Sequence, residues 1–140
     1  NLSETIRASA ERHERRTASN VMLALEALPG QLPLSIRSCA YRVVQEGLTN
    51  AFRHADARGQ LVSARVVGEY IEISVSDSGP GFVGASREDG HVGQGLAGLR
   101  DRVEALGGTF YCVSRPEGGA MLVTRLPLPP DASRAEPPHG

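Results

Sequence analysis

The clearest hydrophobic pattern in the chain runs from Tyr41 to Ala57, where apolar residues recur at steps of three and four. That spacing is typical of an amphipathic helix with one buried face. The helix is expected to begin near Pro33–Ser35, because proline fits a first turn and Ser35 can cap it. The apolar positions are Ala40, Val43, Val44, Gly47, Leu48, Ala51, Phe52 and Ala55.

Another face of the same helix carries four polar side chains, those of Glu46, Asn50, Arg53 and His54. Residues three and four apart are neighbours on a helix surface, so all four side chains can reach one ligand. A carboxylate, an amide, a guanidinium and an imidazole are an unusual set for a solvent face. Taken alone, the helix leaves two interpretations open: a ligand site, or a solvated stripe of ion pairs.

Alternation of apolar and polar residues predicts the strands, and a second three-and-four pattern predicts another amphipathic helix. Residues 2–17 are expected to form a polar helix that Ser3 can cap, and residues 21–28, although acceptable in a helix, are predicted as a strand. The remaining predicted elements are a hairpin of Gln60–Val67 and Tyr70–Ser76, a helix over Leu96–Leu106 stopped by Gly107 and Gly108, and a second hairpin of Thr109–Ser114 and Ala120–Leu128.

These elements predict an α+β fold, a two-layer sandwich in which helices cover one face of a mixed, mostly antiparallel sheet. Ile71, Ile73 and Val75 share one face of their strand and are expected to point toward the helices. We expect one domain, residues 1–128. The following tail, residues 129–140, has four prolines and no large apolar side chain, so it is expected to be disordered.

The composition excludes several kinds of chemistry. The 140 residues carry a net charge of −1, which gives no sign of a nucleic-acid-binding surface. All 15 basic residues are arginine, so lysine Schiff bases and the P-loop lysine are absent. Cys39 and Cys112 lack metal-ligand spacing and are expected to be buried, reduced thiols. No apolar run is long enough to span a bilayer, no signal peptide opens the chain, and Asn1 in place of methionine leads us to expect an excised piece of a longer protein.

Two glycine-rich boxes carry the candidate chemistry. Asp77–Gly81 (DSGPG) directly follows a predicted strand, and Gly93–Gly98 (GQGLAG) opens a predicted helix. The second box matches the dinucleotide fingerprint G-x-G-x-x-G, but no strand leads into it and no parallel βαβ unit surrounds it, which argues against a dinucleotide-binding fold. Glycines allow a ligand to approach the backbone, and the unpaired N–H groups that begin a helix favour phosphate.

The boxes E-G-L-T-N-A-F-R-H-A, D-S-G-P-G and G-Q-G-L-A-G-L, in this order and at these separations, resemble the GHKL ATPase family, whose fold is called the Bergerat fold. The family includes gyrase-type topoisomerases, mismatch-repair ATPases and histidine kinases. The box Q-E-x-x-x-N-x-x-R-H and the segment L-R-D-R-V-E-A-L-G-G most resemble the sensor histidine kinases paired with LuxR-type response regulators. The resemblance covers about residues 2–128.

The resemblance implies a site for ATP and Mg²⁺. Asn50 matches the asparagine whose side-chain oxygen holds Mg²⁺, and Glu46 matches a catalytic glutamate that polarises the attacking group or orders a Mg²⁺-bound water. Arg53 and His54 match positions beside the phosphates. Asp77 matches the acceptor of the adenine amino group, where guanine would offer only a carbonyl oxygen. The other implied nucleotide contacts are Gly79, Gly81, Gly93, Gly95, Leu96, Gly98 and Leu99.

The implied function is that of the catalytic, ATP-binding domain of a sensor histidine kinase. Such a domain donates the γ-phosphoryl group of ATP to a histidine on a separate dimerisation domain, and the signal then passes to a response regulator. We expect a cytoplasmic location, as part of a membrane-anchored sensor, with no nucleic acid and no membrane contact in this segment. Two other functions stay open: a stand-alone serine kinase of the anti-sigma type with the same fold, and a nucleotide-sensing interaction module without transfer activity.

Three features qualify the resemblance. Many relatives have threonine directly after the glycines of the last hairpin, where it helps to hold adenine through water, whereas here Ala120 follows. We recognise no dimerisation and phosphoacceptor domain within these 140 residues; His13 lies in a segment faintly like a phosphoacceptor box, but only 33 residues separate it from Glu46. Residues 82–94 would form a short, glycine-rich lid, expected to be mobile without nucleotide.

Overall fold

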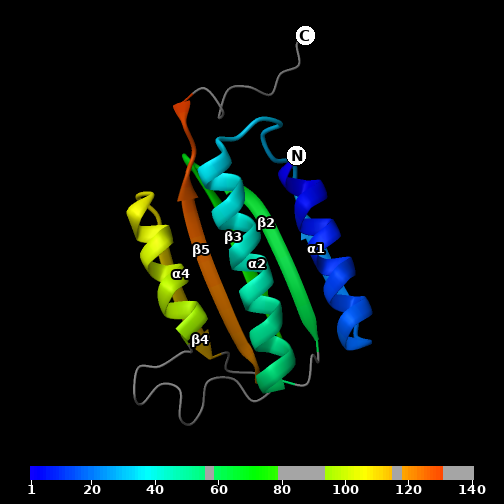
Figure 1. Cartoon of the computed structure of the whole chain (residues 1–140). Coiled ribbons are helices and arrows are strands. Elements are labelled where there is room, and N and C mark those ends of the chain that lie inside the picture. The colour runs from blue at the N-terminus through cyan, green and yellow to red at the C-terminus, as the bar shows by residue number, and fades with distance from the viewer. Residues whose placement is uncertain (56–58, 79–93, 115–117, 131–140) are drawn as a thin grey trace.

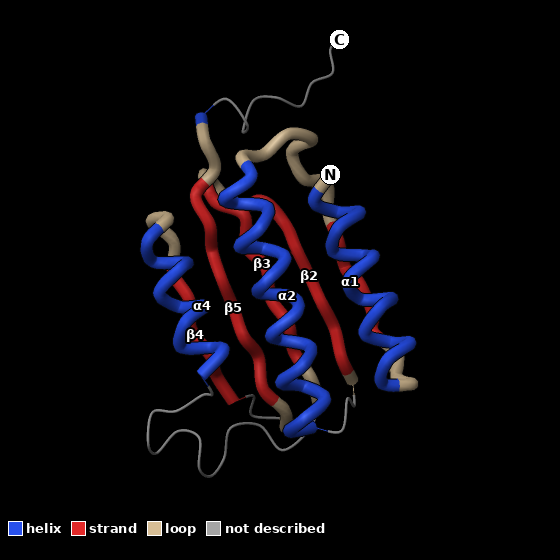
Figure 2. The backbone as a smooth tube through the Cα atoms, viewed as in Figure 1, coloured by secondary structure: helices blue, strands red, loops and turns tan. Residues whose placement is uncertain are grey.

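The computed structural model describes residues 1–55, 59–78, 94–114 and 118–130. In this part of the chain, three helices cover one face of a five-stranded sheet (Figures 1 and 2). The predicted two-layer α+β sandwich is therefore confirmed. The elements are α1 Leu2–Thr17, β1 Val21–Leu25, α2 Leu34–Ala55, β2 Gln60–Val67, β3 Tyr70–Ser76, α4 Gln94–Ala105, β4 Thr109–Ser114 and β5 Ala120–Pro127. The predicted tail beyond residue 130 and the predicted lid up to residue 93 lie outside the described residues.

The sheet is mixed, as expected, with the strand order β1-β2-β3-β5-β4. Only the pairing of β1 with β2 is parallel, and α2 provides the crossover that a parallel pair requires. The other pairs are antiparallel, and both predicted hairpins are present. The first predicted strand is shorter than expected: it ends at Leu25, after which the Glu26 N–H makes one last bond to the Ala64 carbonyl.

The hydrophobic core lies between α2 and the middle strands. Ile71 and Ile73 of β3 are fully buried, as are Val43 and Val44 of α2, so the predicted faces of both elements are correct. Phe52 is the exception, because 45% of its surface is exposed. Its ring lies edge-on to that of His13 in α1, with the ring centroids 6.4 Å apart, instead of entering the core.

The predicted helix caps are wrong, although the helices are right. Asn1, not Ser3, caps α1: its side-chain oxygen accepts a hydrogen bond from the Glu4 N–H at 2.9 Å, and Glu4 completes a capping box. In α2 the N–H of Arg37 donates to the Pro33 carbonyl, so Ser35 lies inside the helix and does not cap it. Hydrophobic spacing locates a helix only to within about a turn, whereas the capping residue must directly precede it.

The end of α4 agrees with the sequence. The N–H of Gly108 donates to the Val103 carbonyl at 2.9 Å, and the N–H of Gly107 donates to the Glu104 carbonyl at 3.0 Å. These two bonds form a Schellman motif, which satisfies carbonyls that the helix end would leave unpaired. The helix begins at Gln94, two residues earlier than predicted.

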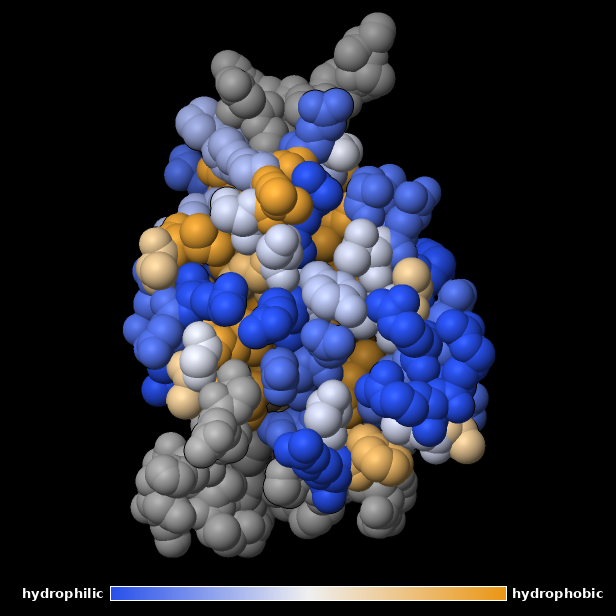
Figure 3. Space-filling view, viewed as in Figure 1, coloured by the Kyte–Doolittle hydropathy of each residue, from blue (hydrophilic) through white to orange (hydrophobic). Residues whose placement is uncertain are grey.

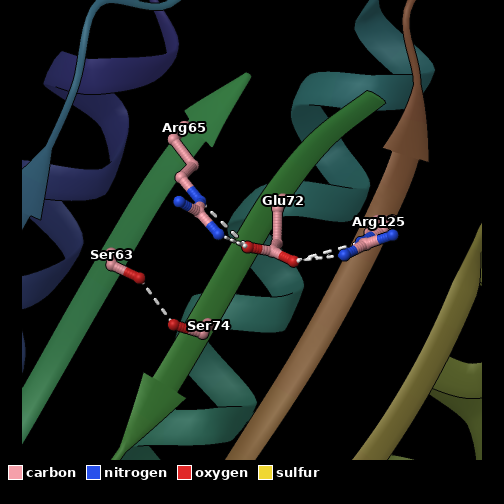
Figure 4. A network of polar contacts seen from close by, with 5 residues as sticks. All are labelled: Ser63, Arg65, Glu72, Ser74 and Arg125. Atoms are coloured by element: carbon pink, nitrogen blue, oxygen red, sulfur yellow. Dashed lines mark hydrogen bonds and ion pairs between the residues drawn. The ribbon is translucent and has the colours of Figure 1, made fainter. Parts of the chain in front are cut away.

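A polar network ties three strands together on the sheet face that points away from α2 (Figure 4). Glu72 of β3 pairs with Arg65 of β2 and with Arg125 of β5, each at 3.0 Å. Burial alone would raise the pKa of Glu72, but the hydrogen bonds from the two guanidinium groups outweigh it and lower that pKa below the usual value of 4.5. On the same face Ser63 and Ser74 share a hydrogen bond.

His13 anchors α1 to the sheet. Its ring is 3% exposed, and its Nε2 lies 2.7 Å from the Gln60 side-chain oxygen. The Gln60 amide nitrogen donates to Ser19 and to the Asn20 carbonyl, so the Gln60 oxygen must accept and His13 Nε2 must carry the proton. Burial lowers the pKa of His13. This buried, neutral ring argues against a phosphoacceptor role.

The outer surface of the helices is mostly hydrophilic, most continuously over α1 (Figure 3). Among the described residues, no helix is both long and apolar enough to cross a membrane. Cys39 is buried as expected, whereas Cys112 is only half-buried, and both thiols are free.

Candidate functional site

The described parts of the three sequence boxes lie at one edge of the sandwich. α2 and β3 end at this edge, while α4 and β5 begin there (Figure 1). The contacts of two residues fix the arrangement. Gly47 in α2 lies against Val75, two residues before Asp77, and Asp77 in turn contacts Ala120 at the start of β5. Segments more than 25 residues apart in sequence therefore meet here.

Glu46 and Asn50 lie on one stripe of α2, a helix that packs against β3 and α4. Both are half-buried, and neither side chain has a hydrogen bond or ion pair within the described part of the chain. Cys39 is seven residues before Glu46 and so lies on the same stripe. Burial raises the pKa of the Cys39 thiol, and the charges of Arg102 in α4 and of Arg42 oppose that rise. A carboxylate and an amide on this stripe are thus available for a ligand.

Not every predicted site residue can be placed. Arg53 is exposed in the last turns of α2, and His54 belongs to the same helix, but its side chain is outside the described residues. Gly79, Gly81 and Gly93 also lie outside them.

Asp77 is the most constrained of the predicted site residues. It is 7% exposed and directly follows β3. Its N–H donates to the Ala120 carbonyl at 3.0 Å, and its side-chain Oδ1 accepts a hydrogen bond from the Ala120 N–H at 3.3 Å. A buried carboxylate at the end of a central strand is suited to accept a hydrogen bond from a ligand amino group.

Leu96 and Leu99, near the start of α4, can contact a ligand only through their backbone. The side chains of Leu96 and Leu99 are buried in the core, 2% and 1% exposed, so their predicted part in nucleotide binding cannot involve side chains. The first four N–H groups of a helix lack partners within it, and this positive end attracts anions. Gly95 lies in that first turn. Gly98 is exposed, and a Cβ atom there would meet nothing within 4 Å.

Two glycines that the sequence reasoning did not assign to the site shape it. A Cβ on Gly47 would lie 2.8 Å from the Val75 Cβ, so this glycine lets α2 pack closely on β3 between Glu46 and Asn50. A Cβ on Gly119 would lie 1.9 Å from the Asp77 carbonyl oxygen. An isolated glycine on the apolar stripe of a helix is a signal of close packing, and it could have identified Gly47.

A resident metal centre is not evident. Among the described residues no group of three or more histidine, cysteine and acidic side chains could hold a metal ion. Magnesium does not require such a group, because it keeps several waters and binds through one or two protein oxygens together with substrate phosphates. The amide oxygen of Asn50 fits that requirement.

Comparison with known proteins decides the family. Residues 37–130 match the model of the "Histidine kinase-, DNA gyrase B-, and HSP90-like ATPase" family, which is more than half of the chain. The chain belongs to this ATPase family. The matched segment contains Glu46, Asn50, Asp77 and the box that opens α4.

The ATPase domain is similar to sensor proteins of bacteria. It is 30% identical over 108 residues to the sensor protein VraS of Staphylococcus saprophyticus, an alignment that covers 76% of this chain and 30% of that protein. The chain thus spans about a third of the length of the curated relatives it matches.

Solved structures confirm the fold. The catalytic domain of histidine kinase ThkA has a TM-score of 0.74 at 20% identity, covering 91% of this chain and 94% of that one. Full-length ShkA in complex with AMPPNP also has a TM-score of 0.74, at 21% identity, and the match covers 91% of this chain and 30% of ShkA. The ATPase domain therefore has the fold of a histidine kinase catalytic domain.

Proposed function

We propose that this ATPase domain is the catalytic part of a sensor histidine kinase, which binds Mg-ATP at the edge described above and donates the γ-phosphoryl group to a histidine on a separate dimerisation domain. The observation that carries the proposal is the buried Asp77 carboxylate, at the same sheet edge as Asn50 and the start of α4. Family membership and the similarity to VraS support it. The Q-E box and the α4 sequence further support a LuxR-type response regulator as the downstream partner.

Each site residue takes one role in this proposal. Asp77 accepts a hydrogen bond from the adenine amino group, while Asn50 offers its amide oxygen to Mg²⁺, which would neutralise phosphate charge when bound. Glu46 acts on the attacking group, and Arg53 and His54 lie beside the phosphates. The glycine boxes supply backbone contacts through Gly79, Gly81, Gly93, Gly95 and Gly98 and the N–H groups of Leu96 and Leu99.

The phosphoryl transfer requires little covalent chemistry from the domain itself. An imidazole nitrogen of the partner histidine attacks the γ-phosphorus, the bond between that phosphorus and the β,γ-bridging oxygen breaks, and ADP leaves with the electron pair. Catalysis of such a transfer rests on positioning and on neutralising charge. The close packing of α2 on β3 is suited to positioning. Because the reaction consumes ATP, the proposal places this domain in the cytoplasm.

Calorimetry with ATP and GTP in the presence of Mg²⁺ tests the proposal. Wild-type protein should prefer ATP, because guanine would place a carbonyl oxygen against the Asp77 carboxylate. Asp77→Asn should weaken ATP binding by about 1–3 kcal/mol, the usual worth of a hydrogen bond to a charged group. The matched control is Asp101→Asn, an exposed aspartate of α4, which should bind ATP as the wild type does. Equal affinity of the wild type for ATP and GTP would contradict the proposal.

A further inference from the structure

We infer that the backbone of Gly119 and Ala120 positions the Asp77 carboxylate and thereby sets the base selectivity of the site. This inference rests on the proposed function, because it assumes that Asp77 reads the nucleotide base. It concerns the segment in which the sequence departs from the family pattern, because Ala120 stands where many relatives have threonine.

The hydrogen-bond ladder between β3 and β5 changes at Asp77. Ser76 pairs with Met121, so Asp77 comes next, opposite Ala120. In a hydrogen-bonded antiparallel pair, each residue donates its N–H to the carbonyl of the other. Here the Asp77 N–H donates to the Ala120 carbonyl at 3.0 Å, but the Ala120 N–H donates to the side-chain Oδ1 of Asp77 at 3.3 Å. The strand pair thus holds the carboxylate itself.

Gly119 makes this arrangement possible. Its φ is +102°, a conformation that residues with a side chain rarely adopt. A Cβ at this position would lie 1.9 Å from the Asp77 carbonyl oxygen and 2.9 Å from the Ser78 Cα. The chain therefore passes directly against the backbone of the Asp77 box, and no other residue type fits without moving it.

Positioning the carboxylate has a consequence for the ligand. An aspartate side chain has only two torsion angles, so one fixed oxygen also defines where the second oxygen lies. A carboxylate held in place at a 7% exposed position distinguishes an amino group from a carbonyl better than one that can rotate. The alanine methyl group offers no polar atom, so in this chain the backbone N–H of residue 120 carries the polar contact.

The test compares two glycine substitutions. Gly119→Ala should displace Asp77, whereas Gly68→Ala is the matched control: Gly68 also has a positive φ, +62°, but a Cβ there meets nothing within 4 Å. Gly68 lies in the β2–β3 turn, at the other end of β3. The measured quantity is the ratio of the dissociation constants for Mg-GTP and Mg-ATP, with thermal unfolding to show that both variants are folded.

Gly119→Ala should lower the GTP/ATP ratio about tenfold, toward the value of Asp77→Asn, because a hydrogen bond to a charged group is worth about that factor. Gly68→Ala should keep the wild-type ratio within about twofold, even if it is less stable. A folded Gly119→Ala protein with the wild-type ratio would overturn the inference and leave the proposed function intact. Equal affinity of the wild type for both nucleotides would instead contradict the proposed function.

A second measurement needs no substitution at Gly119. The amide proton resonance of Ala120 should differ between the wild type and Asp77→Asn, because the substitution replaces a charged acceptor with a neutral one. An Ala120 resonance that is the same in both proteins would overturn the inference.

Discussion

Adding one methyl group to Gly47 is expected to disturb the contact between α2 and β3 on which the site depends. Gly47 lies between Glu46 and Asn50 on α2, and its Cα faces the side chain of Val75. The Cβ of an alanine here would lie 2.8 Å, 2.9 Å and 3.0 Å from the three side-chain carbons of Val75. Carbon atoms pack best at about 3.5–4.0 Å, so the helix must move outward by roughly half an ångström or more.

Two opposing effects set the size of the change. Replacing glycine by alanine inside a helix stabilises the protein by about 1 kcal/mol through helix propensity. Overpacking a tight contact costs about 1–3 kcal/mol. The net effect of Gly47→Ala is therefore a loss of about 0–2 kcal/mol in the free energy of unfolding.

Urea unfolding of the nucleotide-free domain measures this, and Gly98→Ala is the control. Gly98 is also inside a helix, but a Cβ there meets nothing within 4 Å, so Gly98→Ala should stabilise the fold by about 1 kcal/mol. The difference between the two variants isolates the steric cost, which should be about 1–3 kcal/mol. In a Val75→Ala background, which removes two of the three close carbons, that cost should shrink.

If Gly47→Ala stabilises the domain as much as Gly98→Ala, the close approach of α2 to β3 is not what glycine provides at position 47. If it destabilises the domain equally in both Val75 backgrounds, the strain arises elsewhere.

Two further predictions concern the pH dependence of stability, through His13 and Glu72. Burial lowers the folded-state pKa of His13 below 6.5, so the stability that neutral His13 contributes is fully present above pH 6.5 and is lost as the pH falls below that value. Between pH 7.5 and pH 5.5, urea unfolding should therefore show a smaller loss of stability in His13→Gln than in the wild type. Equal losses would refute this explanation. The folded-state pKa of Glu72 is lowered, so the stability that its carboxylate contributes is present above pH 4.5 and is lost as the pH falls through the folded-state pKa. Glu72→Gln should cost roughly 1 kcal/mol at pH 7, because Arg65 and Arg125 are partly exposed, and this cost should shrink as the pH falls below 4.5. A cost that does not change as the pH is lowered would contradict the ion-pair explanation.

The elements of the fold could be predicted because they depend on local patterns. The alternation of Ile71, Ile73 and Val75 set the inner face of β3, and the two glycines after α4 marked its end. Local patterns are insufficient where two nearby residues could both cap the same helix. Asn1 and Ser3 are both good caps, and only the position of the first helical residue decides between them.

The site was predictable in its residue types but not in its supporting contacts. Glu46, Asn50 and Asp77 were identified from their boxes, and the structure brings their segments to one edge. The hydrogen bond from the Ala120 N–H to the Asp77 carboxylate joins residues 43 apart in sequence, and no spacing rule connects them. Phe52 was expected in the core because it fits the apolar stripe, yet it lies against His13 of α1. Which neighbour a helix face meets is settled by tertiary packing.

The central claim is that Glu46 acts in phosphoryl transfer while Asn50 and Asp77 bind the nucleotide. The most direct test measures Mg-ATP affinity and phosphoryl transfer for Glu46→Gln, with a phosphoacceptor hairpin of a related kinase supplied in the assay. Glu104→Gln, an exposed glutamate of α4, is the control. We expect Glu46→Gln to bind Mg-ATP almost as the wild type does and to transfer about 100-fold more slowly, since general acid–base groups contribute at least that much. Undiminished transfer, or an equal loss of binding and transfer, would contradict the claim.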